Sequence, residues 1–300
     1  MWSFAHGYKD ILMEAVNSIL HQTFEDFEFI IYDDGSCPEA ATLLREVEGL
    51  DERIKLIGQD ENHGLAFSLN ACIDEAKGKY IARMDADDIS ELYRMEHQKK
   101  YLEENDFDLI GGISQMIDED GNTIYSIKKV PTNFKKIKKC IKYNQVISHP
   151  TWFGKKEVFD KLNGYRNMPL CEDYDFTLRA ILQGFKISNV NECVLKYRMT
   201  KDSISRSNLF EQYLFARYIT KQYSEGKVSE VEEAKAYVKK NLSDKNAKRY
   251  LKGNERFNNA LNNLEEKQYI QFIANGIALL FTSKYYLDKI FRFVMVYLNS

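Results

Sequence analysis

Roughly the first 200 residues of the chain predict an α/β fold with a mostly parallel sheet flanked by helices. Helix-type and strand-type apolar patterns alternate along this part of the sequence, which is typical of such a sheet. Acidic residues gather where predicted strands end. From about Asn208 the strand patterns stop and the sequence becomes helical and rich in Lys, Glu and Asn. We therefore expect one α/β domain at residues 1–207 and a helical region at residues 208–300.

The first elements can be justified from local patterns. Apolar residues within 11–20 recur on one helical face, and the run at 27–32 is typical of a buried strand. Ser36 and Glu39 have the spacing of a capping box, and Pro38 suits the first turn of the helix that follows.

A second strand is expected at 53–57, and a helix at 65–76 with Gly78 as its C-cap. An apolar strand at 79–84 then leads directly into a group of acids. The remaining predicted elements are helices at 94–104, 134–143 and 172–183, strands at 109–117, 123–130 and 190–197, a hairpin turn at 120–122, and a helix end at Gly184.

Composition excludes several functional classes. With 42 basic and 45 acidic residues the net charge is -3, which argues against a nucleic-acid-binding protein because phosphate neutralisation needs a basic surplus. The five cysteines are scattered and the five histidines form no H-x-x-x-H pair, so neither a disulfide framework nor a zinc site is expected. We recognise no signal peptide and no apolar run of about 18 residues, which favours a cytoplasmic protein.

Two acidic clusters follow predicted strands. Asp33 and Asp34 close the first strand, and Asp85 and Asp87 close the strand at 79–84. Ligands of open α/β sheets bind beyond the carboxyl ends of strands. In extended backbone, a D-x-D pair would place two carboxylates on one side of the chain, roughly 6–7 Å apart. Such oxygen ligands suit Mg²⁺ or Mn²⁺. The alternative is that these acids only form turns and helix caps.

A third acidic group, Glu172, Asp173 and Asp175, begins the helix predicted at 172–183. In a functional interpretation, Asp173 is a general base that removes a proton from an acceptor hydroxyl. The alternative is that helix N-termini simply favour carboxylates, by about 0.3–1 kcal/mol.

Taken together and in order, these motifs resemble the family 2 glycosyltransferases, inverting enzymes of the GT-A fold. The resemblance covers residues 9–206. Its motifs are the segments 17–23, 29–36, 62–65, 82–88, 149–151, 163–165, 172–175, 197–198 and 203–205, together with Asn70. Each motif is weak alone, but their order and spacing are specific.

The resemblance implies roles for individual residues. Asp33 and Asp34 would contact the donor nucleotide, together with Asn62 and Asp85. Asp87 would be the direct ligand of a divalent metal, Mn²⁺ or Mg²⁺.

The resemblance also makes Asp173 the catalytic base, with Glu172 beside it at the acceptor or diphosphate. His149 and Arg198 would border the diphosphate or the acceptor. For His149 the alternative is a structural histidine, and for Arg198 a strand-end residue in a salt bridge. The partners so implied are a nucleotide-sugar donor, with uridine diphosphate as the expected leaving group, and a glycan or lipid-linked acceptor. Sugar, linkage and oligomeric state are not fixed by the sequence.

The sequence departs from the family pattern at two places. Relatives usually begin with an apolar strand, whereas residues 1–7 already stand at its expected end. We expect this strand to be reduced to a stub, which would open neighbouring strand edges and weaken donor binding. A truncated start and a destabilised or inactive protein both remain open. Thr200 stands where many relatives have a histidine.

The C-terminal segment 269–298 combines apolar and aromatic residues with Lys284, Lys289 and Arg292. Such a segment can lie in a membrane interface, which would place the protein on the inner face of the cell membrane. The alternative is a helix that packs its apolar face on the enzyme. Two other functions also remain open. One is a sugar nucleotidyltransferase, although no Gly-rich phosphate loop is present. The other is a non-catalytic relative that binds a partner or a glycan.

Overall fold

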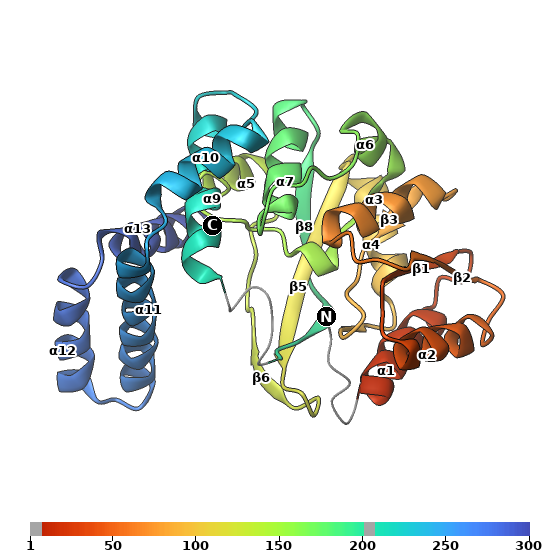
Figure 1. The fold of residues 1–300 in the computed structure, drawn as a ribbon, viewed down its shortest axis with the longest axis horizontal. Helices are drawn as coiled ribbons and strands as arrows, with labels where there is room; N and C mark the ends of the chain where they lie inside the picture. The colour runs from red at the N-terminus through yellow and green to blue at the C-terminus, as the bar shows by residue number, and fades with distance from the viewer. Residues whose placement is uncertain (1–7, 201–207) are drawn as a thin grey trace. The chain divides into compact units, whose positions relative to one another are not determined.

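The computed structural model describes residues 8–200 and 208–300. Its fold divides into two units, which are described separately (Figure 1). One unit consists of residues 1–138, 145–167 and 172–201, and the other of residues 139–144, 168–171 and 202–300. We call them the α/β unit and the helical unit. The two short segments at 139–144 and 168–171 were expected in the first domain but belong to the helical unit.

The α/β unit follows the predicted alternation of helices and strands. Its elements are α1 (Tyr8–Leu20), β1 (Phe29–Asp34), α2 (Pro38–Glu48), β2 (Ile54–Gln59), α3 (Leu65–Glu75), β3 (Tyr80–Ala82), β4 (Ile89–Ser90), α4 (Arg94–Glu104), β5 (Leu109–Ile117), β6 (Thr123–Ser126), the start of α5 (Phe134–Cys140), the 3₁₀ helix η1 (His149–Thr151), β7 (Phe153–Lys155), α6 (Lys156–Lys161), α7 (Glu172–Leu182) and β8 (Ile187–Arg198).

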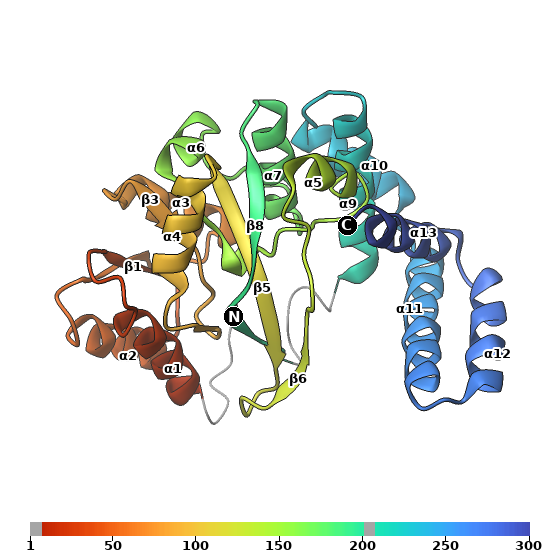
Figure 2. The same cartoon turned by 180° about the vertical axis from the view of Figure 1, so that it is seen from behind.

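The larger sheet is mixed, so the expectation of a mostly parallel sheet is wrong, although the α/β class is confirmed. Its strand order is β3-β7-β5-β8-β4, with β6 paired to β5. The long strands β5 and β8 run parallel, and helices and loops form the crossover connection that a parallel pair needs. Strand β6 follows β5 through the predicted hairpin and runs antiparallel to it. The pairs β3–β7, β5–β7 and β4–β8 are also antiparallel. Figures 1 and 2 show β5 and β8 side by side.

Strands β1 and β2 form a separate parallel pair. Within residues 8–200 and 208–300, β1 pairs with β2 alone and β3 with β7 alone. Residues 1–7, where the stub of the first strand was expected, lie outside the described part. Apolar side chains of α1, α2 and β2 pack together beside this pair, including Val16, Val47 and Ile54. A second apolar cluster joins α4, β5, β7 and β8. Burial of each such side chain contributes about 1.5–3 kcal/mol.

Two of the predicted helix caps are wrong. The N-cap of α2 is Cys37, without a side-chain cap, because the Ser36 N–H donates instead to Asp33 Oδ1 at 2.9 Å. The C-cap of α3 is Ala76, and the N–H of Gly78 donates to the Glu28 carboxylate at 2.9 Å. The carboxylate that binds the backbone N–H is three residues away in the first case and fifty residues away in the second.

The helical unit consists of α9 (Leu209–Ser224), α10 (Val231–Asn241), α11 (Asp244–Glu265), α12 (Tyr269–Leu280) and α13 (Lys284–Asn299), with the two short segments. Helices α11 and α12 lie side by side (Figures 1 and 2). Aromatic side chains form much of the core, with Phe210 packed on Tyr250 and Tyr250 on Tyr286. Among the described helices, none combines the length and the apolar character needed to cross a membrane.

Candidate active site

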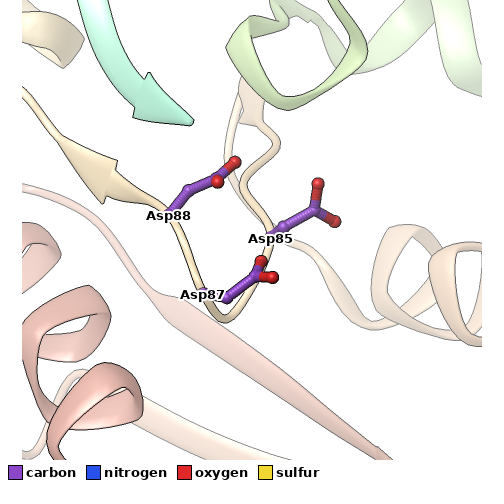
Figure 3. A group of neighbouring side chains, drawn as sticks. All are labelled: Asp85, Asp87 and Asp88. Carbon is purple, nitrogen blue, oxygen red and sulfur yellow. The ribbon is translucent and has the colours of Figure 1, made fainter. Parts of the chain in front are cut away.

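The loop between β3 and β4 gathers three carboxylates. The N–H of Asp88 donates to the Asp85 carbonyl at 3.3 Å, which closes a turn. This turn replaces the extended D-x-D backbone expected from the sequence. As a result Asp88 joins Asp85 and Asp87, and their ligand oxygens all lie within 4.8 Å of one another (Figure 3). The sequence placed Asp88 in this acidic motif but gave it no role in the site.

These carboxylates strongly influence one another. Burial, and then the charge of Asp85, raise the pKa of Asp87 to about 6. Burial raises the pKa of Asp88 to about 8, with contributions from Asp85 and Asp87. One Asp88 oxygen, Oδ1, accepts the Arg198 N–H at 2.9 Å, while the buried Oδ2 has no hydrogen-bond partner among the described residues. The three carboxyl groups therefore disfavour full ionisation unless a cation compensates their negative charge.

Arg83, which sequence reasoning did not select, is the central cation of the site. Its guanidinium is buried and forms a two-pronged ion pair with Asp85. Its carbonyl accepts Nη2–H of the buried Arg94 at 2.7 Å, and its N–H donates to the Trp152 carbonyl at 2.9 Å. The signal in the sequence was an arginine two residues before an acidic cluster, at the end of an apolar strand.

Arg198 ends β8 and forms an ion pair there, and its contact with the diphosphate or the acceptor stays a prediction. Its side chain is 1% exposed and pairs with Glu14 Oε2 at 2.7 Å. The same guanidinium donates to the carbonyls of Asp87, Asp118 and Glu119. Arg198 therefore fixes the backbone of the acidic turn from its buried side.

His149 is also buried, and its Nε2 lies 2.8 Å from the Tyr165 hydroxyl. Burial, assisted by the charge of Arg83, holds the pKa of His149 well below its usual range. Burial raises the pKa of Tyr165. Both rings pack on Trp152, so His149 is a neutral histidine hydrogen-bonded within an aromatic cluster, and its contact with the diphosphate or the acceptor stays a prediction.

Asp173 and Glu172 begin α7 as predicted and remain partly open to solvent. Burial raises the pKa of Asp173, opposed by a hydrogen bond from Gln145 Nε2 to Asp173 Oδ2 at 3.3 Å and by the charge of Arg83. Burial, and then the charge of Asp173, raise the pKa of Glu172 to about 7. Asp85 also contributes to this shift. Arg83 therefore acts electrostatically on both acidic groups, at the turn and at α7.

Asp175, the third acid of this motif, is structural. It is 2% exposed and binds the guanidinium groups of Arg166 and Arg179. Arg179 also donates to the carbonyls of Leu162 and Gly164, at 2.7 and 2.9 Å. This network ties the start of α7 to the loop before it, and so fixes the backbone that carries Asp173.

Asp33 and Asp34 end β1, as predicted. The two oxygens of Asp34 accept the N–H groups of His63 and Gly64, at 2.8 and 2.9 Å. The Asn62 amide donates to the Asp34 carbonyl at 3.0 Å. Of the four expected nucleotide contacts, Asp34 and Asn62 are thus held together just before α3, Asp33 precedes Asp34 in β1, and Asp85 lies in the acidic turn. Residues 203–205 of the last motif lie outside the described part.

Comparison with known proteins identifies the family. The sequence model described as "Glycosyl transferase family 2" matches residues 4–162. The chain belongs to this family. It is 36% identical over 225 residues to the O-antigen biosynthesis glycosyltransferase WbnJ of Escherichia coli, covering 73% of this chain and 85% of that protein. It is 35% identical over 218 residues to an uncharacterised glycosyltransferase of Methanocaldococcus jannaschii, covering 72% of this chain and 75% of that protein.

Solved structures of glycosyltransferases share the fold. The mannosyltransferase PcManGT of Pyrobaculum calidifontis, in complex with GDP-Man and Mn²⁺, matches with a TM-score of 0.57 at 16% identity, covering 77% of this chain and 66% of that one. S. aureus TarS 1–349 in complex with UDP-GlcNAc matches with a TM-score of 0.58 at 16% identity, covering 78% and 68%. The GT-A fold is therefore confirmed, the protein is a glycosyltransferase, and the nucleotidyltransferase alternative is wrong.

Proposed function

We propose that this glycosyltransferase moves a sugar from a nucleotide diphosphate, with UDP as the expected leaving group, to a hydroxyl of a growing glycan. The observation that carries the proposal is the acidic turn, where the ligand oxygens of Asp85, Asp87 and Asp88 lie within 4.8 Å of one another; the acids that begin α7 form a second acidic group. One group suits a cation beside the donor, and the other suits a base for the acceptor. Asp33, Asp34 and Asn62 would border the nucleotide. The non-catalytic alternative keeps no specific observation in its favour.

The acidic turn fits a divalent cation, Mn²⁺ or Mg²⁺. Asp85, Asp87 and Asp88 supply only oxygen ligands, which hard cations prefer, and one buried Asp88 oxygen lacks a partner within the described residues. We expect Asp87 to be the direct ligand. When bound, the cation would offset the negative charge that develops on the leaving diphosphate. Arg83 and Arg198 hold the turn in place.

Asp173 is the proposed base. The acceptor oxygen forms a bond to the anomeric carbon, the bond from that carbon to the diphosphate oxygen breaks, and the hydroxyl proton passes to the Asp173 carboxylate. A single displacement inverts the anomeric configuration. Gln145 orients the carboxylate and limits the rise of its pKa that burial causes. Glu172 would contact the acceptor or the diphosphate.

The relatives' names indicate the acceptor class. WbnJ is described as acting in O-antigen biosynthesis, and TuaG of Bacillus subtilis, 27% identical over 203 residues, in teichuronic acid biosynthesis. By analogy we expect a surface polysaccharide or a lipid-linked glycan as the acceptor.

Attachment to the inner membrane surface would bring the enzyme to such acceptors. Helix α12 contains no charged residue and leaves Ile270 82% exposed, and Phe281 just after it is 79% exposed. Isolated exposed apolar residues are common, but a helical face of them favours an interface. The double variant Ile270→Asp/Phe281→Asp should float less with anionic vesicles than the wild type. The control Leu50→Asp changes an exposed leucine of the α/β unit and should float like the wild type. Equal flotation of all three proteins would contradict the attachment.

Incubation with Mn²⁺ and a panel of nucleotide sugars tests the catalytic proposal. We expect slow nucleotide release, which Asp87→Ala abolishes. With acceptor present, Asp173→Asn should lower transfer at least 10³-fold. The matched control Asp74→Asn changes an exposed carboxylate on α3 and should keep full activity. Full transfer by Asp173→Asn would exclude this residue as the base, and no thermal shift with any donor would favour a non-catalytic relative.

A further inference from the structure

A cavity of about 570 Å³ lies entirely within the helical unit. Helices α9, α10 and α13 and the short segment at 139–144 line it. Its volume is in the range of sites that bind small molecules. None of the acids proposed for catalysis lines it, so it is a separate feature of the enzyme.

Positive charge dominates the lining. Lys142, Arg217, Lys221 and Arg292 face a single carboxylate, Asp288. Asp288 pairs with Arg217 at 2.7 Å and with Arg292 at 3.0 Å. Both lysines are exposed, and within the described residues neither has an ion-pair partner. The cavity therefore has an excess of three positive charges, two of them on side chains free to meet a ligand.

One of the two arginines that line the cavity, Arg292, is fixed in place. Arg292 donates to the Tyr143 carbonyl and to Thr220 Oγ1, each at 3.0 Å, and its side chain is 14% exposed. Because most of its N–H donors are engaged by Asp288, Thr220 and backbone carbonyls, Arg292 supplies a fixed positive charge to the cavity.

Aromatic rings form part of the wall. Tyr143 and Phe291 meet edge to face at 6.2 Å, and Tyr218 and Tyr237 pack at 5.3 Å. Phe291 remains exposed and Tyr237 partly exposed. Aromatic faces beside hydroxyl groups suit the apolar face and the polar rim of a sugar ring.

We propose that this cavity binds a sugar that carries an oxyanion, either a phosphate or a carboxylate. Two free lysines and Arg292 neutralise the anion, and the aromatic wall packs on the ring. If the proposed function holds, this ligand is a segment of an anionic acceptor glycan. The binding of an anionic sugar by the cavity does not rest on the proposed function; its identification as the acceptor does. The cavity would then select negatively charged acceptors, at a place other than the catalytic residues.

The test measures equilibrium binding of sugar probes to the full chain in EDTA. EDTA removes divalent cations, so the metal-dependent donor site does not contribute to the binding. The probes are trigalacturonate for a carboxylate source, glucose 1,6-bisphosphate for a phosphate source, and maltotriose as a neutral control. We expect at least one anion to bind more tightly than maltotriose, and the tighter anion identifies the source. Lys142→Gln/Lys221→Gln should weaken that binding about tenfold, from two lost charge contacts.

Lys252→Gln is the matched control, because it removes an exposed lysine of α11 away from the cavity. It should bind like the wild type. The proposal is overturned if neither anion exceeds maltotriose, or if the double variant binds as tightly as the wild type. Donor hydrolysis in Mn²⁺ is measured on the same proteins, and we expect it to be unchanged in the double variant. Loss of the anion site with intact hydrolysis separates this proposal from the proposed catalytic function.

Discussion

Glu172 should make the α/β unit less stable as pH rises through neutrality. Its pKa is raised from 4.5 to about 7, first by burial and then by the charge of Asp173. A raised carboxyl pKa means that the folded state binds the proton more tightly than the unfolded state does. The stabilisation is therefore complete below pH 4.5 and is lost as pH rises through about 7. Glu172→Gln removes the titrating group and should remove this dependence.

The magnitude follows from the pKa. Each pH unit corresponds to about 1.4 kcal/mol, so the full shift would be worth about 3 kcal/mol. Because the Glu172 side chain is partly open to solvent, we halve this value. Between pH 5 and pH 8 the free energy of unfolding of the wild type should fall by about 1.5 kcal/mol more than that of Glu172→Gln.

Urea titrations in EDTA at pH 5, 6, 7 and 8 measure this difference. Trp152 is fully buried in the α/β unit, so its fluorescence reports unfolding of the unit that carries Glu172. Trp2→Phe removes the other tryptophan of the chain from the signal. As a control, Glu104→Gln changes an exposed carboxylate of α4 and should follow the wild type. Parallel pH dependence of the wild type and Glu172→Gln, within about 0.3 kcal/mol, would refute the reasoning.

Three further predictions concern the base, the backbone and the metal. Gln145→Leu removes a hydrogen bond that lowers the pKa of Asp173 against burial, so the acid limb of the transfer rate should move to higher pH; an unmoved limb contradicts this. Gly164 has φ +64° and an added Cβ would lie 2.3 Å from Asn70 Oδ1, so Gly164→Ala should destabilise by at least about 2 kcal/mol in urea titrations. Gly184→Ala is its control, with φ +92° and open space, and should cost only about 1 kcal/mol; equal losses would contradict the clash. Chelation of divalent cations should abolish transfer and lower Tm, and Mn²⁺ should restore both; transfer in EDTA would exclude metal assistance.

Periodic patterns predicted the elements well where local sequence controls them. The bounds expected for α4 (Arg94–Glu104) and β5 (Leu109–Ile117) are those of the structure; α4 buries one face that includes Met95 and Leu102, and β5 is buried along most of its length. The hairpin after β5 was predicted from the Asp120-Gly121 or Gly121-Asn122 pair, and in the structure Gly121 has a positive φ. Strand direction was not predictable, because the period of a strand carries no information on which neighbour it meets.

Sequence motifs located the acidic turn but did not predict its geometry. An acidic motif after a strand identified Asp85 and Asp87, yet the turn that adds Asp88 depends on Arg198, more than a hundred residues away. The role of Arg83 was missed for the same reason: a buried arginine is recognised only when its partners from other elements are known. Long-range hydrogen bonds, not local propensity, fix this site.

Charge balance explains why metal assistance should accompany donor binding. Asp85, Asp87 and Asp88 lie within one small space, while the guanidinium of Arg198 is engaged by Glu14 and by carbonyl groups. Arg83 is shared between Asp85 and the acids of α7. An approaching diphosphate would therefore meet an excess of negative charge and would be repelled. Asp85, Asp87 and Asp88 would hold a divalent cation, whose charge would reverse the sign of the field at the turn and would favour the ionised form of the buried Asp88 carboxyl. The residues that make the free site unfavourable at neutral pH are thus the ones that make a cation-bound donor favourable there.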